Sequence, residues 1–348
     1  MKTVNVCFIT DIGYAVPTAV AVQSLIENRG KSTKYNIYIV AVNLDNDKIA
    51  TFTNLANRDC RIRVITTRNM YDNIDTNHLY VSKAALLKFD LPNMFPELNK
   101  ILYLDSDILV LGDLLELYNT DLSDKYAAVV PDMAGMLYGN HHTKFGFDKY
   151  FNSGVMLLNL KKMRNDKISE KLIDYKLHKD VGDFMDQDCL NYVFQQNVIY
   201  ISPMYNWMAG NISGFTNDEI QKFYDITETD LDNIRQNPVV LHLTNKHKPW
   251  NSNNAVGYYL WWQYHKNMLH KKHSPISRLA RFFFRHKVYP NGRHKILLCG
   301  IKVFSYKPRF LPDATVKGNF WFATETLPNG RKHIYVCGIK IASYKENR

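Results

Sequence analysis

Two aspartates, Asp105 and Asp107, follow a short apolar run and are the residue pair best suited to chemistry. Ile101 to Leu104 precede them, and a second apolar run begins at Ile108. A run this short is typical of a strand buried on both faces. Two carboxylates at its end are costly unless a cation neutralises them. Carboxylate oxygens suit Mg²⁺ or Mn²⁺, and a cation held by two of them keeps positions open for substrate phosphates. A plain acidic turn is the alternative interpretation.

The segments before Asp105 predict a parallel sheet. The predicted elements are strands at 4–10, 35–42 and 61–65, separated by helices at 17–28 and 45–57. This alternation implies parallel strands joined by right-handed crossovers. Ligands in such sheets bind beyond the carboxyl ends of the strands. Asp11 and Asp105 each follow a predicted strand, so we expect both to face one crevice.

The later segments continue the α/β pattern. The predicted elements are a helix at 82–89, strands at 101–104 and 127–130, a turn at 151–154 that opens a strand to 160, helices at 161–179 and from 186, a strand at 239–243, and a helix at 255–268. The last of these helices is expected to close the catalytic unit.

Length and composition indicate one large folded domain with an appendage. The chain has 348 residues, of which 46% are hydrophobic and 13% aromatic. Its first residues enter a strand pattern without the features of a signal peptide. Five cysteines without metal-ligand spacing indicate reduced thiols. We therefore expect a cytoplasmic protein.

The net charge of +11 is unevenly distributed. Residues 266–348 contain 18 Lys or Arg against 3 Asp or Glu, whereas residues 1–265 contain 26 against 30. Within the tail, the basic residues Arg278, Arg281, Arg285 and Lys287 surround three consecutive phenylalanines at 282–284. This pattern favours peripheral contact with an anionic membrane surface. No nucleic-acid partner is expected, because no recognition motif accompanies the charge.

A tandem repeat ends the chain. Residues 290–307 and 328–345 match at 12 of 18 positions, and each copy reads as a Pro-Asn-Gly turn, a strand, a Cys-Gly break and a second strand. Two β-hairpins are therefore predicted. The domain prediction is a catalytic domain at 1–265, a basic aromatic segment at 266–289 and a repeat module at 290–348. A protein-binding or glycan-binding module and a structural cap are the alternatives to membrane contact.

Six short motifs in order resemble family 8 of the retaining glycosyltransferases, a group that includes bacterial lipopolysaccharide galactosyl- and glucosyltransferases and glycogenin. The motifs are F-I-T-D-x-x-Y at 8–14, S-K-A at 82–84, L-Y-L-D-S-D at 102–107, F-N-S-G-V at 151–155, D-Q-D-x-L-N at 186–191 and H-x-x-x-x-x-K-P-W at 242–250. The resemblance covers about residues 1–265. It implies a GT-A fold, in which helices flank a Rossmann-like mixed sheet.

The resemblance also implies a role for each matching residue. Asp105, Asp107 and His242 would bind the metal, with Mn²⁺ preferred and Mg²⁺ as the alternative. The remaining site residues fall into two sets. Those on the nucleotide and sugar side are Asp11, Tyr14, Lys88, Asp105, Ser106, Asp132, Asn152, Asn245 and Lys248. Those expected to act in catalysis are Asp186, Gln187 and Lys248, the last through the charge it places on the departing diphosphate.

The implied activity is the transfer of galactose or glucose, with retention, from a UDP-sugar to an oligosaccharide or glycolipid acceptor such as lipopolysaccharide. In the family, the residue nearest the reacting face is the amide that matches Gln187, and an amide is a poor nucleophile. We therefore favour attack on the face from which the diphosphate departs, although Asp186 would be the nucleophile of a double displacement. The alternatives are a nucleotidyltransferase, which normally has a Gly-rich phosphate loop that 8–14 lacks, and a non-catalytic sugar-binding protein.

Three positions depart from the family pattern. Gly13 stands where Asn is frequent, Asn245 where Gly is frequent, and Lys88 where Arg is usual. Lysine keeps the positive charge of arginine but loses its bidentate fork. We expect these changes to alter affinity for the donor before they abolish activity.

Overall fold

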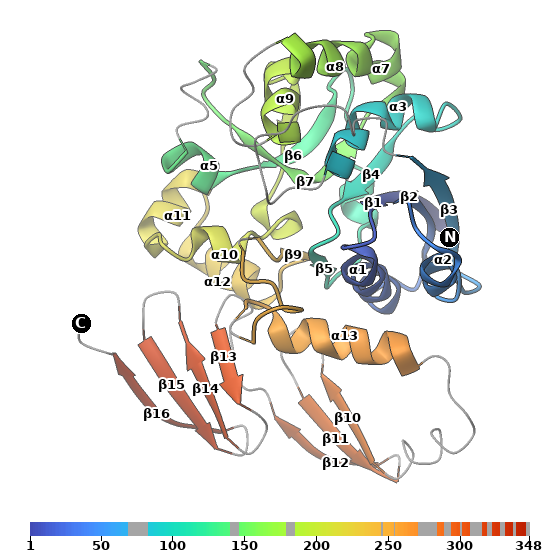
Figure 1. The fold of residues 1–348 in the computed structure, drawn as a ribbon. Helices are drawn as coiled ribbons and strands as arrows, with labels where there is room; N and C mark the ends of the chain where they lie inside the picture. Colours follow the sequence, from blue (N-terminus) through green and yellow to red (C-terminus); the bar gives the residue numbers. More distant parts are fainter. Residues whose placement is uncertain are drawn as a thin grey trace.

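The computed structural model describes residues 1–68, 83–139, 146–178, 185–244, 246–253 and 255–270, and seven segments of the tail: 284–288, 294–299, 301–306, 315–318, 322–327, 331–336 and 339–345. The body is a seven-stranded sheet covered by helices on both faces, and two smaller sheets of the tail lie beside it (Figure 1).

The large sheet has the strand order β3-β2-β1-β4-β7-β6-β8. Its strands are β1 (Lys2–Thr10), β2 (Thr33–Val42), β3 (Cys60–Thr67), β4 (Ile101–Leu104), β6 (Ala127–Pro131), β7 (Phe151–Leu158) and β8 (Val198–Tyr200). The first four strands of this order run parallel, and β7 is antiparallel to both of its neighbours. The predicted mixed sheet is therefore confirmed.

Alternation along the central strands explains their continuous apolar runs. In β1, Val6 and Phe8 belong to one buried cluster while Cys7 and Ile9 belong to the cluster on the opposite face. The strand β4 divides its four residues in the same way. A strand buried on both faces has no polar side, and the sequence accordingly shows none.

Helices cover the two faces. On one face lie α1 (Ala15–Glu27), α2 (Asn46–Thr53), α10 (Ala209–Ile212), α11 (Asn217–Tyr224), α12 (Glu228–Gln236) and α13 (Tyr258–His270). On the other lie the 3-10 helix η1 (Lys83–Asp90), α3 (Leu91–Met94), α7 (Leu160–Asn165), α8 (Ile168–His178) and α9 (Met185–Phe194). Short helices α4 (Leu115–Tyr118) and α5 (Met133–Leu137), and the 3-10 helix η2 (Pro203–Tyr205), join the strands.

Two sequence predictions about these elements are wrong. Residues 151–154 do not form a turn but lie within β7, where the register against β6 shifts between Val129 and Val130. A bulge of this kind tolerates small polar residues and redirects their side chains. The helix predicted at 161–179 is two helices, because Lys167 has a φ of 51° that interrupts helical geometry.

A small second sheet connects distant parts of the chain. The strand β5 (Ile108–Val110) pairs antiparallel with β9 (Val240–His242), so that Ile108 lies opposite His242. The residues that follow Asp105 are therefore joined to a segment near the end of the body.

The tail forms two antiparallel sheets. One contains β10 (Phe284–Val288), β11 (His294–Leu298) and β12 (Ile301–Tyr306). The other contains β13 (Thr315–Gly318), β14 (Phe322–Thr326), β15 (Arg331–Val336) and β16 (Ile339–Lys345). Both predicted hairpins are confirmed, and each has a register shift at the same place in the repeat. The repeated unit has one strand more than predicted. The strand β10 pairs with the first hairpin in the same register in which β14 pairs with the second.

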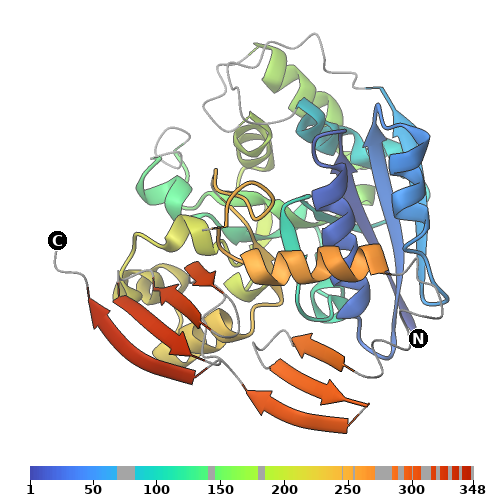
Figure 2. The ribbon, with the colours of Figure 1, turned by 60° about the horizontal axis from the view of Figure 1, so that its bottom comes forward.

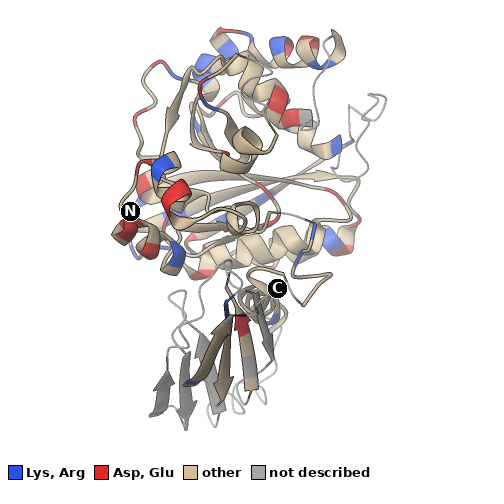
Figure 3. Ribbon diagram, turned by 90° about the vertical axis from the view of Figure 1, so that its left-hand side faces the viewer, with Lys and Arg blue, Asp and Glu red and all other residues tan. Residues whose placement is uncertain are grey.

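The helix α13 lies between the body and the sheets of the tail (Figure 2). It is held to α1 by hydrogen bonds from Asn28 to the Tyr264 hydroxyl (2.8 Å) and from Asn267 to Glu27 (3.0 Å). Among the helices of the described ranges, none is long and apolar enough to cross a membrane. In the view of Figure 3, Lys and Arg are interspersed with Asp and Glu across the body.

Candidate active site

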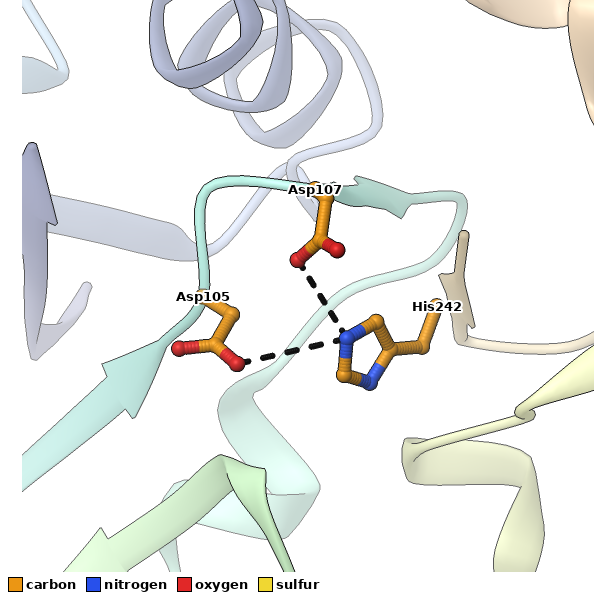
Figure 4. A group of neighbouring side chains, drawn as sticks. All are labelled: Asp105, Asp107 and His242. Atoms are coloured by element: carbon orange, nitrogen blue, oxygen red, sulfur yellow. Dashed lines mark ion pairs between the residues drawn. The ribbon is translucent and has the colours of Figure 1, made fainter. Parts of the chain in front are cut away.

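Asp105, Asp107 and His242 converge at the carboxyl end of β4 (Figure 4). Their ligand atoms all lie within 4.8 Å of one another. The His242 Nε2 atom is 3.3 Å from Asp107 Oδ1 and 4.0 Å from Asp105 Oδ2. Two hard carboxylates and one imidazole nitrogen form a donor set that fits a divalent cation, with borderline first-row metals suited to the imidazole.

The fold fixes the two carboxylates separately. The Asp105 amide donates to the carbonyl of Gly154 (2.8 Å), which anchors the end of β4 to β7. The Asp107 carbonyl accepts from the amide of Leu243 (2.8 Å), so the pairing of β5 with β9 holds Asp107 beside His242. Both carboxylates thus belong to a turn that is tied down on two sides.

Lys248 completes the metal side of the cluster. Its ammonium is 2.6 Å from Asp107 Oδ2. Burial would raise the pKa of Asp107, but its interactions with Lys248 and His242 outweigh burial and leave this pKa well below its usual range. Asp107 is therefore an anion at neutral pH and available as a ligand.

A buried lysine occupies the other side of Asp105. Lys88 has 2% of its side chain exposed, and its ammonium is 3.1 Å from Asp105 Oδ1 and 2.7 Å from Asp186 Oδ2. Burial lowers the pKa of Lys88, but the charges of Asp105 and Asp186 raise it to about 12 in total. The hydroxyl of Tyr103 also donates to Asp105 Oδ1 (2.6 Å). Asp105 thus keeps Oδ2 directed at His242.

Replacing Lys88 with methionine is expected to lower the free energy of unfolding by about 3–5 kcal/mol, because two carboxylates lose their buried partner. Denaturant unfolding at neutral pH measures this. The control is Lys162→Met in the half-exposed pair with Asp166, for which less than about 1 kcal/mol is expected. Equal losses in the two variants would contradict this account.

The stabilisation by Lys88 depends on pH. The folded-state pKa of Lys88 is raised above its ordinary 10.5, so the contribution of its charge to the free energy of unfolding is complete below pH 10.5 and is lost as the pH rises through about 12.

Asp132, Asn152 and Gln187, which we call the sugar-side cluster, form one hydrogen-bonded group. Gln187 donates from Nε2 to Asp132 Oδ2 (3.1 Å), and Asn152 donates from Nδ2 to Gln187 Oε1 (3.0 Å). All three side chains are buried. Asp186 lies next to this cluster but is bound differently, since its carboxylate accepts from Lys88 and from the Ser153 hydroxyl (2.8 Å).

The predicted nucleotide-side residues gather around the end of β1. Asp11 Oδ1 accepts from the amides of Gly13 (2.9 Å) and Tyr14 (3.0 Å). Burial, followed by the charges of Asp107 and Asp105, raises the pKa of Tyr14 to about 12. The hydroxyl of Ser106 lies within the protein, where it donates to the carbonyl of Ile9 (2.9 Å) and accepts from Thr18.

One predicted site residue is not described by the structure, and several residues that contact the site were not predicted. Asn245 lies outside the described residues. Asn206, Ser153 and Tyr103 contact predicted site residues but were not themselves predicted. Tyr103 and Ser153 lie within the motifs at 102–107 and 151–155, whereas Asn206 lies outside all six motifs. Trp250, which packs edge-on against Tyr14 at 5.9 Å, had a signal in its Lys-Pro-Trp motif.

Comparison with protein families identifies the body. The model for glycosyl transferase family 8 matches residues 5–254. The chain belongs to glycosyltransferase family 8. The match includes Asp105, Asp107 and His242, and it ends before the tail.

Curated relatives and solved structures agree with this membership. Lipopolysaccharide 1,2-glucosyltransferase of Escherichia coli is 29% identical over 72% of this chain and 74% of its own length. Glycosyltransferase GlyE of Streptococcus pneumoniae serotype 4 is 32% identical over 53% of this chain, and the match spans 42% of GlyE. The galactosyltransferase LgtC, solved with donor and acceptor sugar analogues, has a TM-score of 0.66 at 23% identity and covers 80% of this chain and 99% of LgtC. The GT-A fold expected of the body is thereby confirmed.

Proposed function

We propose that this family 8 chain is a metal-dependent retaining hexosyltransferase that moves galactose or glucose from a UDP-sugar to a cell-surface glycan such as lipopolysaccharide. The observation that carries the proposal is the cluster of Asp105, Asp107 and His242 with Lys248 at the carboxyl end of a sheet strand. The relatives' names support a hexose donor and a lipopolysaccharide acceptor.

The metal side would bind the diphosphate. Asp105, Asp107 and His242 are the residues that would hold the ion, for which we propose Mn²⁺, with Mg²⁺ as the alternative. When bound, the ion would neutralise charge on the departing nucleotide. Lys248 adds a second positive charge there, because its ammonium already lies against Asp107. Asp11 and Tyr14 would position the uridine.

The bonds of Gln187 favour same-face attack. Its Oε1 atom accepts from Asn152 and from the Ser153 amide, and its Nε2 atom donates to Asp132. An amide held in this way can orient a sugar but is a poor nucleophile. Asp186, the carboxylate that a double displacement would use as its nucleophile, is paired with Lys88, which lowers its nucleophilicity. We therefore propose that the acceptor hydroxyl attacks from the side of the diphosphate, whose oxygen takes the hydroxyl proton.

UDP release from a panel of UDP-sugars, measured with Mn²⁺ and with EDTA, tests the proposed function. Hydrolysis of one UDP-hexose that EDTA abolishes would support the reaction class and identify the donor. UDP binding that requires metal, without hydrolysis, would support a transferase that needs its acceptor. The absence of both would contradict the proposal and favour a glycan-binding protein.

We further propose that the basic tail contacts the anionic inner face of the cytoplasmic membrane. Both repeats expose apolar residues at matching positions: Leu298 and Val336, and Val303 and Ile341. Exposed apolar residues in a strongly basic module favour an interfacial role. Of the basic aromatic segment at 266–289, residues 271–283 lie outside the described residues.

The variant with Val303→Ser and Ile341→Ser is expected to bind vesicles of phosphatidylglycerol several-fold more weakly than the unaltered chain, because less apolar surface enters the interface. Co-sedimentation measures the bound fraction. Leu177→Ser, at an exposed residue of α8, is the control and should bind normally. Equal binding to neutral phosphatidylcholine vesicles, or undiminished binding by the double variant, would contradict membrane contact.

A further inference from the structure

A fully buried asparagine joins the metal side of the site to the sugar side. Asn206 follows η2 and has no exposed surface. Its Oδ1 atom is 2.9 Å from His242 Nδ1, and its Nδ2 atom is 2.9 Å from Asn152 Oδ1. One side chain therefore contacts both a metal-site histidine and a member of the sugar-side cluster.

The main chain determines which way each amide of this network points. The Gly154 amide donates to Asn152 Oδ1 (3.0 Å), and the Ser153 amide donates to Gln187 Oε1 (3.0 Å). A main-chain N–H can only donate, so both of these side-chain atoms must be oxygens. Asn152 therefore presents an acceptor to Asn206, and Asn206 must donate to it from its NH₂ group.

The orientation of Asn206 then fixes the histidine. With its NH₂ group directed at Asn152, Asn206 presents its oxygen to His242 Nδ1, which must carry a proton to donate. In a neutral imidazole the other nitrogen, Nε2, then has a free lone pair. That nitrogen is the one directed at Asp105 and Asp107. Two main-chain amides thus fix the orientation of the side-chain amides, and hydrogen bonds through Asn152 and Asn206 hold His242 in the Nδ1–H tautomer that a metal ligand needs.

We propose that Asn206 is a positioning residue that holds His242 in the Nδ1–H tautomer and orients it toward the metal. Residues that orient a ligating histidine in this way commonly change metal affinity by about 10–100-fold when removed. The same side chain would couple the metal side to Asn152 and Gln187. The metal part rests on the proposed function, whereas the tautomer does not.

The direct test is ¹⁵N NMR of histidine-labelled, metal-free protein at a pH where the His242 ring is neutral. We expect the Nδ1–H tautomer in the unaltered chain and a mixture of tautomers in Asn206→Leu, a variant of similar size without polar atoms. Asn206→Asp keeps an acceptor for His242 and should keep the tautomer. Asn5→Ala removes an amide of β1 that bonds the Tyr118 hydroxyl and Asn36, and it should leave the His242 signals unchanged.

Mn²⁺ affinity gives the second readout, measured from the EPR signal of free Mn²⁺ in the presence of UDP. It should fall about 10–100-fold in Asn206→Leu and by less in Asn206→Asp. An Nε2–H tautomer in the unaltered chain would overturn the proposal even if no variant folds. An unchanged tautomer and unchanged affinity in Asn206→Leu would also overturn it. If the unaltered chain bound no Mn²⁺, the proposed function would fail, and the NMR result alone would decide the role of Asn206.

Discussion

Replacing Asp107 with alanine is expected to reduce sugar transfer by roughly 10³-fold, the largest effect that we predict for a single side chain. The carboxylate is one of three groups that can hold the metal, and it also neutralises Lys248. Its removal would leave the Lys248 ammonium without its carboxylate partner and Asp105 as the one carboxylate of the trio, so a cation would be bound much more weakly. Mn²⁺ binding and UDP release, measured on the same preparation, check both effects.

A control separates loss of the site from loss of the fold. Asp113 lies six residues further along and accepts from the hydroxyls of Thr33 (2.6 Å) and Tyr35 (2.7 Å), away from the cluster. Asp113→Ala should lower the melting temperature while leaving Mn²⁺ affinity unchanged. If Asp107→Ala kept full Mn²⁺ affinity, the assignment of the metal site would be wrong.

Gly154→Ala is expected to disable the site by adding one methyl group. A Cβ atom at this position would lie 2.3 Å from His242 Cε1, 2.8 Å from Asp105 Oδ2 and 2.9 Å from Asn152 Oδ1. Contacts this short force neighbours to move, and His242 and Asn152 are both held by buried hydrogen bonds. We expect Mn²⁺ affinity and transfer to fall at least about 10-fold, as for lost orientation of a ligand.

Gly112→Ala is the matched control, because its Cβ would meet the Val239 side chain at 3.3 Å and no residue of the cluster. Calorimetric melting and Mn²⁺ titration of the two variants would distinguish local crowding from general strain. Normal Mn²⁺ affinity in Gly154→Ala would show that the ring of His242 can move without loss of binding, against our account of a fixed histidine.

Sequence reasoning succeeded where a pattern has one physical cause. The central strands were recognisable because residues such as Val6 and Cys7 face opposite buried clusters, which requires an uninterrupted apolar run. Asp105 and Asp107 were recognisable because carboxylates rarely end such a strand without a counter-charge. His242 required the family motif, since a histidine in an apolar strand is by itself ambiguous.

The failures have equally specific causes. The Asn-Ser-Gly residues at 152–154 have the composition of a turn, and only the pairing partner reveals a bulged strand. Lys167 interrupts a helix without being a helix-breaking residue type. The spacing of residues in the sequence does not reveal Asn206, because its role depends on main-chain amides contributed by β7. The strand β10 was not predicted, because its sequence shares little beyond a phenylalanine with that of β14. Each of these two strands nevertheless pairs with its own hairpin, and in the same register.

The pairing of β5 with β9 also has a consequence for synthesis of the chain. It joins Ile108 to His242, which are 134 positions apart. While the chain is being made, both carboxylates emerge from the ribosome long before the imidazole and Lys248. Closing so long a loop makes this a late and slow step of folding. A partly made chain could thus form most of its parallel sheet, yet it would be unable to bind metal until nearly the whole body had been translated.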